Sequence, residues 1–180
     1  REPAASEPST PTPACSKVST PNAGTIEEVS TFLKASPDRF LKSLLYAAGD
    51  DVVLAVVRGD HEINEIKLAR ALGVGEVALA TEEQIVKATG AKVGFAGPVG
   101  FKGRVLIDRD AAVVHAAITG ANETDFHLVN VEFKREGMKP TPQQTREHDR
   151  LRGHRVTVFV VDSVKAGRLT LAAANAHALV

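Results

Sequence analysis

The chain has 180 residues, of which 43% are hydrophobic and 24% charged, so one compact domain with flexible ends is expected. Lys plus Arg and Asp plus Glu number 22 each, which excludes a strong overall attraction for nucleic acid; any such contact must be local or supported by another domain. A single cysteine, Cys15, excludes an intrachain disulfide framework and a thiolate metal cluster. Without an apolar run of membrane-spanning length or a signal-peptide pattern, we expect a cytoplasmic protein.

Residues 1–17 contain four prolines among small polar residues, a composition typical of a flexible linker. The chain begins at Arg1 and not at Met, which indicates a piece of a longer protein. A helix is predicted over residues 26–34, with Thr25 as N-cap and Glu28 as its capping-box partner.

Ser36 and Pro37 then predict a short second helix that ends near Lys42. The apolar segments LLYAA and VVLAVV, joined by GDD, predict a hairpin in the core. Asp60 is the predicted cap of a helix over HEINEIKLARAL that Gly73 ends.

The next elements are a short buried strand in VALA and a helix in TEEQIVKATG that a capping box of Thr81 and Gln84 begins. The glycine-rich loop GFAGPVGFKG follows. After it come a strand in RVLIDRD, a short apolar element of open type in AAVVHAAI, a turn in GANETD and a strand in FHLVNVEF. From residue 137 the chain is polar, with one further strand predicted in RVTVFVV; no function is inferred for this part.

The glycine-rich loop admits several interpretations that imply different proteins. Its repeat is too short for collagen, its apolar G-x-x-G units do not lie between two helices as in a KH domain, and it lacks the G-x-G of a dinucleotide fingerprint. What remains is a loop whose glycines permit close approach of a backbone or ligand, with Pro98 fixing a turn. An ordinary connection and the wall of a site both stay open.

Other polar residues are ambiguous from the pattern alone. HEINE resembles a zinc motif, but Glu65 replaces the second histidine, so no metal site is predicted. His127 shares a predicted strand face with Val129, Val131 and Phe133, and either lines a pocket or is a buried histidine bonded to backbone. From the pattern alone, Lys42 is interpreted as a solvated lysine. Asp108 is either a residue on an exposed strand face or a polar group of a functional site.

Seven segments taken together carry a resemblance to a known family. They are VSTPNAGTIEEV, FLKSLL, VVRGDHEINEIKL, ATEEQI, GFAGPVG, VLIDR and GANETDFHLVNV, in this order over roughly residues 18–135. They resemble the insertion editing domain of bacterial prolyl-tRNA synthetase, which is related to the freestanding YbaK-type aminoacyl-tRNA deacylases. STPNAGTIEE and RGDHEINE favour the synthetase insertion over the freestanding relatives.

The resemblance implies an α/β (mixed α+β) fold: a single compact domain with a mixed, mostly antiparallel central sheet flanked by helices. It places the editing domain at residues 18–136, between the linker 1–17 and a poorly specified C-terminal extension, 137–180. The implied partners are the 3′ end of tRNA(Pro) mischarged with alanine and the rest of a synthetase chain. No cofactor is implied, and ATP binding belongs to the parent enzyme only.

The implied activity is hydrolysis of the aminoacyl ester of that tRNA. Carried over residue by residue, the implied catalytic positions are Lys42, Gly94, Gly97 and Pro98. The implied substrate-binding positions are Thr20, Phe95, Ala96, Asp108 and His127.

This assignment is physically coherent because alanine is smaller than proline, so a second, smaller pocket can admit it and reject the proline ring. Backbone N–H groups of GFAGPVG are expected to bind the developing oxyanion. The alternatives are a freestanding-type deacylase for tRNA carrying cysteine or serine, a non-catalytic module that binds tRNA or a synthetase, and an accidental match of a generic α/β domain.

Overall fold

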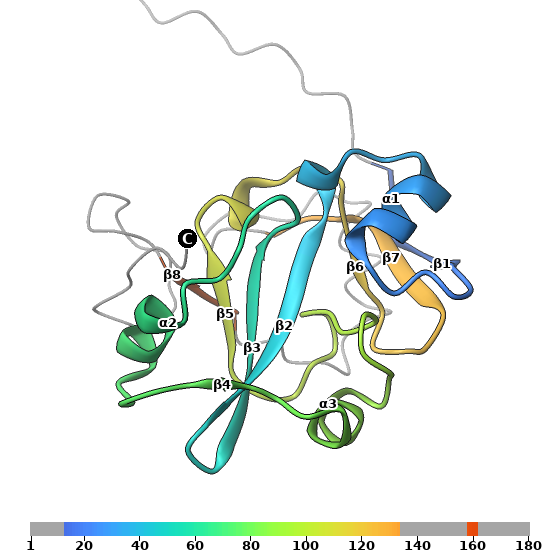
Figure 1. Cartoon of the computed structure of the whole chain (residues 1–180). Helices are drawn as coiled ribbons and strands as arrows, with labels where there is room; N and C mark the ends of the chain where they lie inside the picture. The colour runs from blue at the N-terminus through green and yellow to red at the C-terminus, as the bar shows by residue number, and fades with distance from the viewer. Residues whose placement is uncertain (1–12, 134–157, 162–180) are drawn as a thin grey trace, which may run out of the picture.

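A computed structural model describes residues 13–133 and 158–161 of the chain. Figure 1 shows a curved array of strands with α1 and α2 at opposite ends of it. The elements in chain order are β1 (Ser16–Ser19), α1 (Ile26–Leu33), the 3-10 turn η1 (Pro37–Arg39), β2 (Leu41–Ala48), β3 (Asp51–Arg58), α2 (Glu65–Leu72), β4 (Ala78–Leu79), α3 (Glu82–Thr89), β5 (Val105–Asp108), η2 (Ala111–Val113), β6 (Ala117–Gly120), β7 (Phe126–Val131) and β8 (Val158–Val161).

The strands form a three-stranded sheet, β1-β7-β6, and a five-stranded sheet, β4-β2-β3-β5-β8. Most pairs are antiparallel; β3 with β5 and β5 with β8 are parallel. A single parallel bridge between Phe40 and Ile118 joins the two sheets. The predicted fold class is therefore confirmed, although the strands divide into two sheets where one central sheet was expected.

Both faces of β3 are buried, which explains why VVLAVV is a continuous apolar run. On one face, Leu45 and Val56 pack in a central cluster with Ala96 of the glycine-rich loop. On the other face, Val57 packs against Leu68 of α2. A third cluster, beside α1, contains Phe40 and Ile118 and so covers the junction of the two sheets.

The helix starts at Thr25 and Thr81 are confirmed, because both residues form complete capping boxes. The Thr25 hydroxyl accepts from the Glu28 N–H at 3.2 Å, and the Glu28 carboxylate accepts from the Thr25 N–H at 3.0 Å. α1 ends at Leu33, and Lys34 is its left-handed C-cap. The hairpin of β2 and β3 is also confirmed, with eight paired residues in each strand.

The predicted second helix is wrong beyond its first turn. η1 spans only Pro37–Arg39, and Lys42 lies in β2 and not at the end of a helix. Leu41 and Lys42 pair with Arg58 and Val57 of β3. The hairpin ladder, formed with a distant part of the sequence, outweighs the local helix signal of Ser36 and Pro37.

Two smaller predictions are also wrong. Asp60 does not cap α2, because its carboxylate binds the Arg58 guanidinium; the cap is Asn64, whose side-chain oxygen accepts from the Lys67 N–H at 3.1 Å. The strand in VALA is reduced to β4, which is exposed at the sheet edge and not buried.

At the start of the described region, β1 begins at Ser16, so Ser16 and Lys17 of the predicted linker pair with β7. Cys15 packs against the central cluster. The strand predicted in RVTVFVV is confirmed as β8, parallel to β5. The rest of the extension 137–180, with His148, His154 and His177, lies outside the described residues, and the domain boundaries stay predictions. In the described part of the chain, no helix has the length and apolarity to cross a bilayer.

Candidate active site

Strand register brings residues from four strands to one face. His127 of β7 pairs with Gly120 of β6, and directly opposed residues share a face. The bridge between Phe40 and Ile118 is parallel, so Lys42 and Gly120 each lie two residues beyond it on that same face. The ends of β2 and β6 therefore place Lys42 on the face that carries His127.

The register of the larger sheet places Asp108 on this face too. Lys42 pairs with Val57, and Val56 pairs with Ile107, so Asp108 follows at the level of Val57. Asp108 thus shares the face of Lys42. Asp108 is 2% exposed, so the alternative of an exposed-face residue is wrong.

His127 and Thr20 form a buried polar pair. Thr20 Oγ1 lies 2.7 Å from His127 Nδ1, and the residues are 0% and 4% exposed. The Phe95 ring lies against the imidazole, with centroids 5.5 Å apart and planes tilted by 57°. Burial lowers the pKa of His127 from 6.5 to about 4, so the ring is neutral at pH 7.

The predicted strand face of His127 is correct only in part. Val129 packs in the cluster beside α1, whereas Val131 and Phe133 pack in the central cluster. Asn130 has a φ of 58°, and this left-handed residue interrupts the two-residue alternation of β7.

The loop 94–98 lies flat against the neighbouring backbone. A Cβ at Gly97 would stand 1.9 Å from the Gly120 oxygen, and a Cβ at Gly120 would stand 2.3 Å from the Ala96 oxygen. Gly94 has a φ of 95°, and a Cβ there would stand 2.2 Å from the Gly24 oxygen. The glycines therefore permit close backbone approach, as predicted, and the loop packs on the strand that carries Gly120.

A residue that sequence reasoning missed holds this loop. Asn122 accepts the Gly97 N–H at 2.9 Å, and its Nδ2 donates to the Gly97 and Val99 carbonyls at 2.9 and 2.8 Å. The Gly97 N–H is thus engaged and is not a free oxyanion donor, and Pro98 has no N–H. The only signal in the sequence was an Asn in the GANETD turn, a residue type that tolerates a left-handed backbone.

Lys42 forms an ion pair with a side chain that solvent surrounds. Its Nζ lies 2.6 Å from Glu62 Oε1; the Lys42 side chain is 17% exposed and that of Glu62 is 87% exposed. The Lys42 amine is therefore held by Glu62, and breaking this ion pair costs little free energy because the Glu62 carboxylate can be solvated instead.

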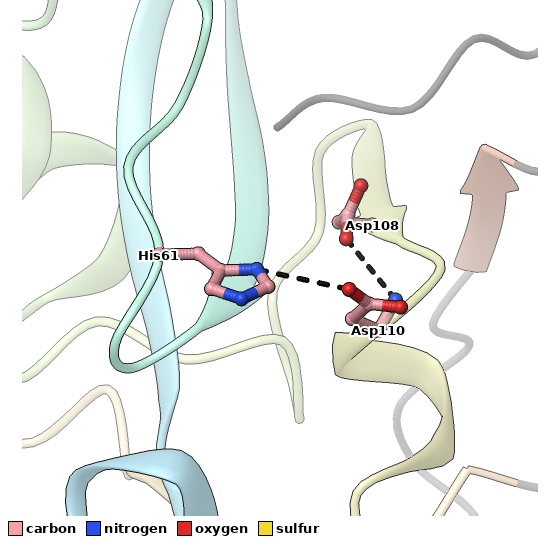
Figure 2. A group of neighbouring side chains, drawn as sticks. All are labelled: His61, Asp108 and Asp110. Atoms are coloured by element: carbon pink, nitrogen blue, oxygen red, sulfur yellow. Dashed lines mark hydrogen bonds and ion pairs between the residues drawn. The ribbon is translucent and has the colours of Figure 1, made fainter.

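Figure 2 shows Asp108 beside His61 and Asp110. The Asp110 N–H donates to Asp108 Oδ2 at 3.1 Å, and His61 Nδ1 lies 3.9 Å from Asp110 Oδ2. The Arg58 guanidinium, which lowers the pKa of the Asp60 carboxyl, also lies 2.9 Å from His61 Nε2.

The tautomer of His61 disfavours a cation beside Asp108, although His61 Nδ1 is buried and forms no hydrogen bond with the described residues. A guanidinium can only donate, so His61 Nε2 accepts and the ring proton sits on Nδ1, facing the carboxylates. A metal ion bound at Nδ1 would move that proton to Nε2, against the Arg58 N–H.

The structure thus brings Thr20, Phe95 and His127 into direct contact, with the loop 94–98 packed on the strand beside them. Lys42 and Asp108 share their face by register, but are bonded to Glu62 and the Asp110 backbone. The arrangement combines a small buried polar wall, a fixed backbone loop and one amine.

The chain is similar to known proteins in sequence and in fold. The chain is 49% identical over 124 residues to a proline--tRNA ligase of Thermoanaerobacter sp. (strain X514), covering 67% of this chain and 22% of the ligase. It is 44% identical over 134 residues to that of Bacillus velezensis (strain DSM 23117 / BGSC 10A6 / LMG 26770 / FZB42), covering 73% and 24%. The chain therefore spans less than a quarter of either ligase.

A solved structure of a protein assigned as a trans-editing enzyme for prolyl tRNA synthetase has the same fold. Its TM-score is 0.59 at 21% identity, over 82% of this chain and 85% of that one. The family model of the aminoacyl-tRNA editing domain matches residues 20–135, more than half of the chain. The chain belongs to the aminoacyl-tRNA editing domain family.

Proposed function

We propose that this domain hydrolyses the ester of tRNA(Pro) mischarged with alanine, as the editing part of a prolyl-tRNA synthetase. The observation that carries the proposal is the buried pair of Thr20 and His127, walled by Phe95, beside the backbone loop 94–98. The similarity to proline--tRNA ligases supports the choice of tRNA.

The wall formed by His127 supports discrimination by size. The aminoacylation pocket of a synthetase that binds proline discriminates by only about 1–3 kcal/mol of binding free energy against an amino acid that is a methylene or two smaller. Alanine therefore also binds in that pocket. A second pocket bounded by rigid rings can exclude the larger proline. His127 suits this role because it is neutral at pH 7 and fixed by Thr20.

The reaction adds water to the ester carbonyl carbon, and the carbon–oxygen bond to the ribose then breaks. The ribose oxygen takes a proton, and alanine and uncharged tRNA are released. Lys42 supplies a positive charge on the shared face, where it can hold an anionic group of the tRNA or the reacting ester. Because Asn122 occupies the Gly97 N–H, oxyanion binding falls to other donors of the site.

The test is deacylation of Ala-tRNA(Pro) and Pro-tRNA(Pro) by the purified chain. We expect the wild type to prefer the alanyl ester, Lys42→Ala to lose activity by about 10²-fold or more, and His127→Ala to cleave Pro-tRNA(Pro) as well. Lys87→Ala, on the exposed surface of α3, is the matched control and should keep full activity.

Three results would count against the proposal in different ways. Full activity of Lys42→Ala would remove Lys42 from the site. Equal rates on tRNA(Pro) charged with alanine, cysteine or serine would refute the choice of alanine and favour a deacylase with another substrate. No cleavage by wild type, with tRNA still bound, would favour a non-catalytic module.

A further inference from the structure

We propose that Asn122 is a positioning residue of the editing site, one that fixes the loop 94–98 through its side-chain amide. This inference rests on the proposed function for its catalytic meaning, but the clamp itself is a property of the fold. Asn122 lies between β6 and β7, and its backbone N–H also donates to the Phe95 carbonyl at 2.9 Å.

The Asn122 amide bonds both the N–H and the carbonyl of Gly97. Its oxygen accepts from the Gly97 N–H, and its nitrogen donates to the Gly97 and Val99 carbonyls. One partner is a donor and two are acceptors, so the amide has only one orientation that satisfies all three. Pro98, between the two carbonyls, cannot donate, which leaves this stretch dependent on an outside group.

The turn that carries Asn122 also holds the segment that carries Thr20. The Asp125 carbonyl accepts the Thr20 N–H at 2.8 Å, and the Asp125 carboxylate accepts the Asn22 N–H at 3.0 Å. Thr124 accepts the Lys92 N–H at 3.1 Å, just before the loop. Residues 121–125 therefore tie together the loop and the segment of Thr20 that bonds His127.

Loss of the amide removes a partner from the Gly97 N–H and from the carbonyls of Gly97 and Val99, which are partly buried. The loop then keeps the bond from the Asn122 backbone to the Phe95 carbonyl but loses the three side-chain bonds around Gly97 and Val99. A displacement of about 1 Å at a reacting group can cost about 10²-fold in rate. We therefore expect the loss in kcat and not in KM, because in the proposed function the loop lies beside the ester and no contact to the rest of the tRNA is assigned to it.

The variant Asn122→Gly tests this, because glycine keeps the left-handed backbone (φ 53°) while it removes the amide. Asn130→Gly is the matched control: Asn130 has a φ of 58° and one long side-chain bond, of 3.4 Å, to the Ala14 carbonyl. Both variants gain the same conformational freedom in the unfolded state. The two measurements are amide hydrogen exchange at Gly97 by NMR and kcat and KM for Ala-tRNA(Pro).

In Asn122→Gly we expect exchange at Gly97 to rise about tenfold or more, kcat to fall about 10²-fold and KM to stay within about threefold. Asn130→Gly should match wild type in all three. Unchanged exchange at Gly97, or unchanged kcat despite faster exchange, would overturn the proposal. A wild type that protects Gly97 but cleaves no ester would instead refute the proposed function, and with it the catalytic role given to Asn122.

Discussion

Acidification should destabilise the domain through His127. His127 is 4% exposed, and its Nδ1 lies 2.7 Å from Thr20 Oγ1. Burial lowers its pKa to about 4 from an ordinary value of 6.5. The unfolded chain therefore binds this proton at a higher pH than the folded chain does. The stabilisation is complete above about pH 6.5 and is lost as the pH falls towards 4.

The magnitude follows from the two pKa values. As the pH falls from 7 to 5, the unfolding free energy should decrease by about 2 kcal/mol, because the imidazole is protonated in the unfolded chain and still neutral in the folded one. Below pH 4 the total decrease should reach about 3 kcal/mol. Urea denaturation at several pH values measures this loss. His127→Gln should show a smaller decrease than wild type by that amount, because glutamine does not titrate.

His115→Gln is the matched control, since His115 is exposed, and it should keep the pH dependence of wild type. Equal pH dependence of wild type and His127→Gln would refute the reasoning. It would mean that the imidazole is hydrated or charged in the folded state, and so cannot form the neutral wall proposed for the pocket.

Two further variants test the loop and the lysine. Gly97→Ala should lower the unfolding free energy by about 1–3 kcal/mol in urea denaturation, because its Cβ would meet the Gly120 oxygen. Gly75→Ala is the control and should not lower it, because a Cβ there would have nothing within 4 Å. Equal stabilities of the two variants would refute the close packing of the loop. Glu62→Gln should change the unfolding free energy by less than about 1 kcal/mol, because the Glu62 side chain is exposed. It should also lower KM for Ala-tRNA(Pro) in steady-state deacylation, because the carboxylate no longer competes with the tRNA for Lys42. A raised KM would show that Glu62 assists binding.

Local signals predicted the parts of the fold that local chemistry decides. Thr25 and Thr81 cap helices through bonds to residues three positions away, so the pattern contains all the partners. The errors came where residues outside the expected pattern compete for a group. Lys42 belongs to a strand because of β3, and Asp60 loses its capping role because Arg58 binds it.

The site follows the same division. The glycines of the loop predicted close approach, and the structure supplies the surface, at Gly120, that they approach. Asn122 could not be found from the pattern, because its partners are 23 and 25 residues away. His127 was ambiguous for the same reason: Thr20, which makes it a buried polar pair, is 107 residues away.

The most direct test of the account is the rate of ester cleavage in Ala-tRNA(Pro) compared with Pro-tRNA(Pro), by wild type and by Lys42→Ala. The account predicts that the wild-type chain cleaves the alanyl ester and spares the prolyl ester, and that Lys42→Ala cleaves neither above the buffer rate. Equal cleavage of both esters by wild type, or undiminished cleavage by Lys42→Ala, would contradict it.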